Sequence, residues 1–181
     1  MLYSVEQSVL VVLDLQGNLA RGMHNKDVLF RNICCLIQTA QYLEMPILVT
    51  EQVPEKIGRT IPEILGVFTT DPPVIAKESF SCWRSPQFKK VVTDIQRREI
   101  IICGIEAHVC VSQTVLDLIQ DGFRVGCVAD AVSARTADNR RVGLRRIRAA
   151  GADILSVEMI ATELLKTSTH PKFREILKLI K

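Results

Sequence analysis

The chain has 181 residues, of which 48% are hydrophobic and 24% are charged, a composition that is ordinary for a globular domain. This length predicts one domain over residues 1–181, and 9 glycines with 7 prolines exclude a collagen-like or low-complexity chain. A net charge of +3 is too small to indicate nucleic acid or an anionic membrane as a partner. The first residues carry no signal-peptide pattern, and no apolar run approaches the roughly 18 residues of a membrane span, so we expect a cytoplasmic protein without membrane association.

Six cysteines are the one unusual count. They include no Cys-x-x-Cys pair, and the three histidines are scattered, so neither a zinc site nor a thioredoxin-like motif is indicated. Free cysteines are most often small buried hydrophobes. We expect that role for the four cysteines within helix or strand patterns, Cys34, Cys35, Cys103 and Cys127. Cys82 lies in a predicted loop and its role stays open.

Apolar, β-branched runs alternate with helical patterns along the chain. The run at 9–13 is continuously apolar, as a strand buried on both faces should be, and 27–44 then places apolar residues on one helical face. The segment 52–72 is rich in proline and glycine, which predicts a loop with a short helix. Further strands are predicted at 47–50, 74–76, 100–104, 124–129 and 154–157, and further helices at 86–96, 111–121, 138–150, 158–166 and 171–180.

Six strands alternating with helices predict a parallel sheet that is covered by helices on both faces. Right-handed crossovers then give a doubly wound, Rossmann-like α/β fold, a three-layer α/β/α sandwich. Ligands of such folds bind outside the carboxyl ends of the strands. The polar residues that directly follow the strands are therefore the candidates for a functional site.

A carboxylate, an amine and a thiol occupy such positions. Asp14 follows the first predicted strand, Lys77 the third, and Cys110 lies in the helix entry after the fourth. A helix start and a neighbouring ammonium lower the pKa of a thiol, and a carboxylate can take its proton. Each residue alone also has a structural explanation, as a buried thiol, a turn former and a structural lysine. All three residues occupy the same type of position at the ends of strands, which favours a catalytic role over these structural ones.

These residues carry a family pattern. The segments 11–16, 74–80 and 102–114 resemble those of the isochorismatase-like cysteine hydrolase superfamily, which includes nicotinamidases. Within it the chain is similar to the metal-free group of uncharacterised hydrolases. The resemblance implies a sheet of order 3-2-1-4-5-6, with Cys110 as nucleophile, Asp14 as general base and Lys77 as the cation that orients both.

The resemblance also implies how a developing oxyanion would be bound. It places a cis peptide bond between Ile105 and Glu106, which aims the backbone N–H groups of Glu106 or Ala107, together with that of Cys110, at the oxyanion. Metal-dependent nicotinamidases carry an Asp-x-His ligand set after the second strand. This chain has 50-Thr-Glu-Gln-52 there instead, so we expect no metal and no other cofactor.

We therefore expect hydrolysis of a small carbonyl compound, an amide in the first instance, through a Cys110 thioester. Gln16, Phe80 and Trp83 are the candidates for substrate binding, with a core role for Trp83 left open. The family resemblance suggests a homo-oligomer, a dimer or larger.

Two other functions stay open from the sequence. The first is a catalytically silent oligomeric scaffold, in which Cys110 would be no more reactive than Cys34 or Cys127. The second is a nucleic-acid-binding module that uses the basic segment Arg140–Arg148, which carries five arginines. No aromatic-rich RNA-binding pattern accompanies these arginines, so a solvated cationic face is favoured and no nucleic acid is expected.

Overall fold

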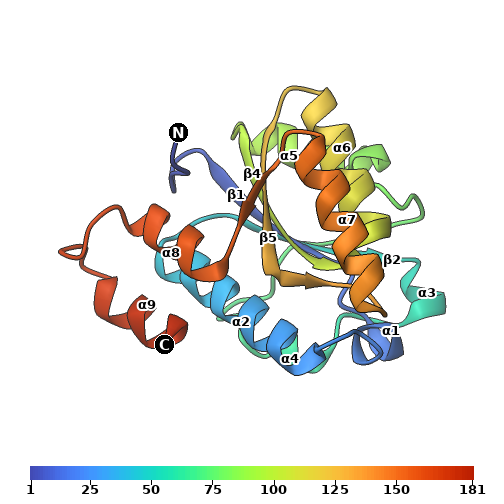
Figure 1. Ribbon diagram of the computed structural model, residues 1–181, viewed down its shortest axis with the longest axis horizontal. Coiled ribbons are helices and arrows are strands. Elements are labelled where there is room, and N and C mark those ends of the chain that lie inside the picture. Colours follow the sequence, from blue (N-terminus) through green and yellow to red (C-terminus); the bar gives the residue numbers. More distant parts are fainter.

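The six strands form one parallel sheet of order β3-β2-β1-β4-β5-β6, which confirms the expected doubly wound α/β fold and strand order (Figure 1). The computed structural model describes residues 1–181. β1 and β4 lie at the centre and are paired along their whole length, from Ser8 opposite Glu99 to Leu13 opposite Gly104. The strands are β1 (Ser8–Leu13), β2 (Ile47–Gln52), β3 (Val74–Lys77), β4 (Glu99–Ile105), β5 (Arg124–Ser133) and β6 (Asp153–Leu155).

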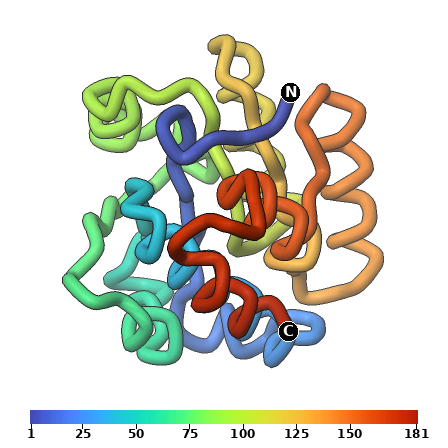
Figure 2. Tube along the Cα trace, turned by 90° about the vertical axis from the view of Figure 1, so that its left-hand side faces the viewer, coloured from blue at the N-terminus to red at the C-terminus, as the bar shows by residue number.

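Helices cover both faces of the sheet (Figure 1). One face carries α2 (Lys26–Tyr42), α4 (Pro62–Leu65), α8 (Val157–Leu165) and α9 (Phe173–Ile180), and the other carries α5 (Pro86–Ile95), α6 (Ser112–Gln120) and α7 (Ala137–Ala149). Figure 2 shows α9, in red, beside the blue α2, with which it is in contact. Short helices complete the chain: α1 (Gly17–Arg21), α3 (Pro54–Ile57), the 3-10 helix η1 (Cys82–Arg84) and the π-helix η2 (Ala107–Val111). None of the helices has the length and apolar character needed to cross a membrane.

The alternating side chains of β1 divide the core into two layers. Val9, Val11 and Leu13 belong to the cluster under α5 and α6, whereas Leu10 and Val12 belong to the cluster under α2 and α8. All five are buried, and fully burying one such side chain stabilises the fold by about 1.5–3 kcal/mol. The two-sided burial explains why the run is apolar without interruption.

β5 is longer than the sequence pattern predicts. It continues to Ser133, and its pairing with β4 shifts register between Ile102 and Gly104 because β5 has three extra residues in this stretch. Asp130 lies in this irregular stretch instead of following the strand. Its side chain accepts a hydrogen bond from the backbone N–H of Val157 at the start of α8 (2.9 Å), so it serves the fold.

Candidate active site

Asp14 directly follows the central strand β1 and is buried. Its φ of +55° turns the backbone sharply at the end of the strand. Two donors hold its carboxylate: the hydroxyl of Thr50 donates to Oδ1 (2.6 Å) and the Lys77 ammonium donates to Oδ2 (2.8 Å). Thr50 comes from the adjacent strand β2 and Lys77 from β3, the strand beyond it, so the sheet itself fixes the direction of the carboxylate.

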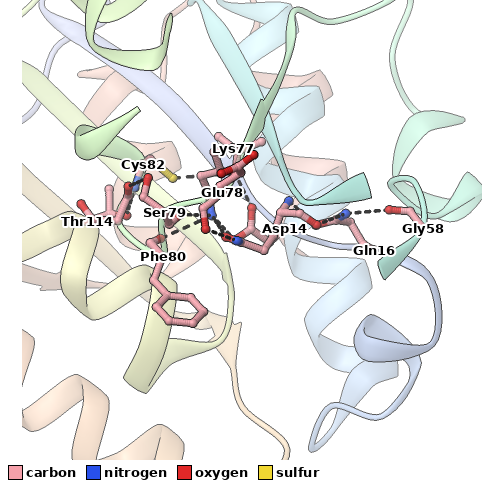
Figure 3. Close-up of polar contacts among 12 residues, drawn as sticks. Asp14, Gln16, Gly58, Lys77, Glu78, Ser79, Phe80, Cys82 and Thr114 are labelled. Carbon is pink, nitrogen blue, oxygen red and sulfur yellow. Dashed lines mark hydrogen bonds and ion pairs between the residues drawn. The ribbon is translucent and has the colours of Figure 1, made fainter. Parts of the chain in front are cut away.

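Lys77 is the last residue of the edge strand β3, and its side chain is buried completely. Nζ reaches over β2 to Asp14 and also donates to Oε1 of Gln52 (2.6 Å) and to the carbonyls of Ser79 and Phe80 (3.3 Å each). Figure 3 shows Lys77 among Asp14, Ser79 and Phe80. Burial opposes the charge most strongly of any single cause, but the Asp14 carboxylate, its hydrogen bond to Nζ, and the sulfurs of Cys82 and Cys110 together outweigh it and raise the pKa of Lys77 above its usual value. The site therefore favours a buried cation.

Cys110 lies in η2, the π-helix that follows β4, and the structure has a cis peptide bond between Ile105 and Glu106 just before it. Gly104, two residues before Glu106, allows β4 to lie close to the end of β1. A Cβ at this position would lie 2.2 Å from the carbonyl oxygen of Leu13, the residue directly before Asp14. The Glu106 carbonyl accepts from the amides of Val109 and Val111. This carbonyl does not engage the three backbone amides that are candidates for binding an oxyanion, which are those of Glu106, Ala107 and Cys110.

The Cys110 thiol is protonated in the resting site. Burial raises its pKa most, the Asp14 carboxylate raises it further, and the Lys77 ammonium opposes both without prevailing. The expectation of a lowered pKa at the helix start is therefore wrong. The physical reason is that the thiol is nearly excluded from water, with 7% of the residue exposed, and faces a carboxylate as well as an ammonium. Any reaction at this sulfur would therefore need a base to take the thiol proton.

Gln16 is buried and its amide is engaged entirely by backbone groups. Its Oε1 accepts from the N–H of Gln52 (2.6 Å), and its Nε2 donates to the carbonyls of Gln52 (3.0 Å) and Gly58 (2.6 Å). Figure 3 shows this side chain pointing away from Lys77, toward Gly58. The amide therefore joins the loop after β1 to the end of β2.

The two aromatic candidates differ in their surroundings. Phe80 is 55% exposed, and its carbonyl accepts from Lys77, so its ring lies at the surface beside the catalytic candidates. Trp83 is buried against Phe88 and Phe123 in edge-to-face contacts, and its Nε1 donates to Asp121. Trp83 thus occupies the core position that the sequence left open, whereas Phe80 is brought to the site.

Three residues of the site carried no assigned role in the sequence: Thr50, Gln52 and Cys82. Cys82 is buried, its thiol lies 3.8 Å from the Thr50 hydroxyl, and burial followed by the charge of Asp14 raises its pKa to about 12. The sequence distinguishes the stretch Thr50–Gln52 only as the place where metal-dependent nicotinamidases carry ligands. Its spacing could not reveal that the first and last side chains bind Asp14 and Lys77.

No group of three or more potential metal-ligating side chains occurs in the structure. After β2, where metal-dependent nicotinamidases carry ligands, the carboxylate of Glu51 accepts from the N–H and hydroxyl of Thr60 and from Arg59. A cavity of about 650 Å³ opens beside the outer side of β3, between Val53–Glu55 and Arg84–Gln87. Asp14 and Cys110 do not line it.

The chain was compared with known proteins. The profile of the Isochorismatase domain matches residues 8–159. The secreted isochorismatase effector Isc1 of Phytophthora sojae is 38% identical over 178 residues, which cover 96% of this chain and 84% of that protein.

Solved structures give the same result for the fold. The structure described as MAR1 ribonuclease from Caenorhabditis elegans superposes with a TM-score of 0.93 at 34% identity, over 99% of this chain and 92% of that one. The YcaC gene product of Escherichia coli, described as an octameric hydrolase of unknown specificity, superposes with a TM-score of 0.88 at 24% identity, over 98% and 95% of the two chains.

Proposed function

Because this chain belongs to the isochorismatase domain family, we propose that it is a cysteine-dependent hydrolase of small carbonyl compounds, with amides as the first substrate class to test. The observation that carries the proposal is the buried pair of Asp14 and Lys77, whose charged atoms lie 2.8 Å apart and both act on the Cys110 thiol. A buried ion pair is a poor source of stability, since desolvation offsets its attraction. Perturbed ionisable groups gathered at strand ends are typical of active sites.

In the first half of the reaction Asp14 takes the proton of Cys110 as the sulfur attacks the substrate carbonyl carbon. The C–S bond forms, and the carbonyl π electrons move to oxygen, where backbone N–H groups of Glu106, Ala107 and Cys110 would stabilise the oxyanion. When the intermediate collapses, the C–N bond breaks and the amine leaves with the proton that Asp14 received. Throughout, Lys77 compensates the negative charge as it moves between Asp14 and the sulfur.

In the second half water attacks the thioester. Asp14 takes a proton from the water, the C–S bond breaks, and the proton passes to the Cys110 sulfur as the carboxylic acid leaves. This cycle restores the protonated thiol and the ionised Asp14, so no oxidant, metal or cofactor is consumed. The protonated resting thiol fits such a general-base mechanism better than a preformed thiolate.

The decisive experiment is mass spectrometry of the intact protein after exposure to a panel of small amides and esters. We expect an acyl adduct on Cys110 that is absent from Cys110→Ala and present in the matched control Cys34→Ala. Full hydrolytic activity of Cys110→Ala would refute the mechanism. A Cys110 that forms no adduct and is alkylated no faster than Cys34 or Cys127 would instead favour the catalytically silent scaffold.

A second candidate function is RNA binding by α7. Arg145, Arg146 and Arg148 are exposed there and form no ion pair, and the C. elegans relative is described as a ribonuclease. The remaining two arginines are engaged: Arg140 donates to carbonyls of β5, and Arg141 pairs with Asp138. Filter binding to single-stranded RNA at physiological salt tests this candidate, and its absence would remove it.

A homo-oligomer is part of the proposal, supported by the octamer described for the E. coli protein. Light scattering after size-exclusion chromatography would give the number of subunits, and a monomer would contradict it. The cytoplasmic location also stays a prediction, which fractionation of cells would test, since the P. sojae relative is described as secreted.

A further inference from the structure

The Lys77 ammonium has only one neutral side chain among its acceptors. Three protons are shared among four oxygens, and the two backbone carbonyls, at 3.3 Å each, are the distant ones. The short contacts are the Asp14 carboxylate at 2.8 Å and Oε1 of Gln52 at 2.6 Å. During the proposed reaction Asp14 loses its negative charge, so Gln52 is the side-chain acceptor that stays unchanged.

The Gln52 amide can face Lys77 in one orientation only. Its Nε2 donates to the carbonyl of Glu78 at 2.6 Å while Oε1 accepts from Lys77. Turning the amide over would set its NH₂ group against an ammonium and its oxygen against a carbonyl, leaving both pairs unsatisfied. Because Gln52 is buried, water cannot supply the missing partners. The amide is thus a fixed acceptor.

A second glutamine holds the first. The regular pairing of β1 with β2 ends at Leu13 opposite Thr50, one step before Asp14. Beyond that point the side chain of Gln16 bonds to both the N–H and the carbonyl of Gln52, as a neighbouring strand would. The backbone of Gln52 is therefore tied to the loop that carries Asp14 by the Gln16 side chain, in addition to the bonds that Thr50 makes with Asp14.

We propose that Gln52 is a positioning residue, held by Gln16, that fixes the Lys77 ammonium between Asp14 and the attacking sulfur. The proposal rests on the proposed function, because only a reacting Cys110 needs that cation in one place. The titratable groups that face Lys77 are Asp14 after β1, Cys82 in η1 and Cys110 in η2. Glu51, next to Gln52, is engaged by Thr60 and Arg59 instead.

The test is the rate of alkylation of each cysteine by iodoacetamide at pH 7, 8 and 9, measured by peptide mass spectrometry. In Gln52→Met we expect the rate for Cys110 to fall about tenfold at each pH, because the pKa of the thiol rises by about one unit, the order expected when a charged group loses one hydrogen bond. Gln16→Met, which releases the backbone of Gln52, should lower the rate in the same direction. The rate for Cys34 serves as the internal reference.

The matched control is Gln41→Met. Gln41 also pins a loop with its amide, donating to the carbonyl of Val67 and accepting from Thr69, but it lies apart from the site. This variant should keep the wild-type rate of Cys110. An unchanged or higher rate in a folded Gln52→Met would overturn the proposal, and the same outcome in Gln16→Met overturns it if Gln52→Met does not fold. Alkylation requires no turnover, so a wild type without acyl adducts refutes the proposed function while the role of Gln52 is still measured.

Discussion

Gly143 is the point where α7 packs closely against η2, the turn that carries Cys110, and replacing it by alanine tests that contact. It is a buried residue in the interior of α7. A Cβ on this residue would lie 2.7 Å from the carbonyl carbon and oxygen of Ala107 and 2.8 Å from the nitrogen of His108. Ordinary contact begins near 3.4 Å, so either the helix or the turn must move by several tenths of an ångström.

The expected cost of Gly143→Ala follows from two opposing effects. Alanine is favoured over glycine within a helix by about 1 kcal/mol. Overpacking a core typically costs 1–3 kcal/mol, and the upper part of that range applies because all three opposing atoms are backbone. We therefore expect the free energy of unfolding to fall by about 1–2 kcal/mol, which is a fall in Tm of roughly 2–8 °C for a domain of this size.

Urea unfolding at pH 7 measures the stability, and alkylation of Cys110 reports on the turn. The matched control is Gly22→Ala, where the added Cβ would lie 3.6 Å from its nearest neighbours, so stability should be unchanged or slightly higher. Equal stability of the two variants would refute the reasoning. A destabilised Gly143→Ala with wild-type alkylation of Cys110 would show that the helix yields and the turn does not.

Three further outcomes are expected. Lys77→Met should lower the free energy of unfolding, measured in urea, by about 3–5 kcal/mol, because it leaves the Asp14 charge buried without its cation. Adding Asp14→Asn should restore most of the lost stability, and a Lys77→Met variant of unchanged stability would contradict the prediction. The free energy of unfolding should fall as the pH is raised above about 9, by about 1.4 kcal/mol per pH unit for each buried thiol. The reason is that the pKa values of Cys82 and Cys127 are raised to about 12 in the folded state, while unfolded thiols ionise near 8.5–9. Urea midpoints at pH 8 and pH 10 check the sign, and a Cys127→Ala background should show a weaker dependence. Trp83→Phe should cost about 1–2 kcal/mol through the lost bond to Asp121 and leave alkylation of Cys110 unchanged, since the ring packs in the core; a changed alkylation rate would argue for a role at the site.

The fold could be predicted because its signals are local. Each strand is a short apolar run, and each long helix has an apolar face, so the chain order of elements follows from the sequence. The candidates Asp14, Lys77 and Cys110 were found for the same reason, since each directly follows or closely follows a strand. β5 was predicted too short because the bulge around Asp130 interrupts the apolar run with a polar residue that caps another element.

The surroundings of the candidates could not be predicted in the same way. Thr50 and Gln52 act on Asp14 and Lys77 from another strand, and nothing in their spacing distinguishes them from ordinary polar residues at a strand end. The direction of the Cys110 pKa depends on how completely the thiol is buried, which a helix position alone does not give. Trp83 follows Lys77 closely in the chain but packs in the core, where its ring contacts Phe88 and Phe123.

The strand order distributes the catalytic candidates unequally over the sheet. Asp14 and Cys110 follow the two central strands, whereas Lys77 ends a four-residue edge strand that is paired with β2 alone. Edge segments open locally at lower free energy than central ones, which amide hydrogen exchange detects. In mild denaturant the amides of β3 should therefore exchange before those of the central strands β1 and β4, and Lys77 would leave the acid and the thiol while both are still in place. The reactivity of Cys110 would then be lost before the protein unfolds, at the denaturant concentration at which β3 detaches from the sheet.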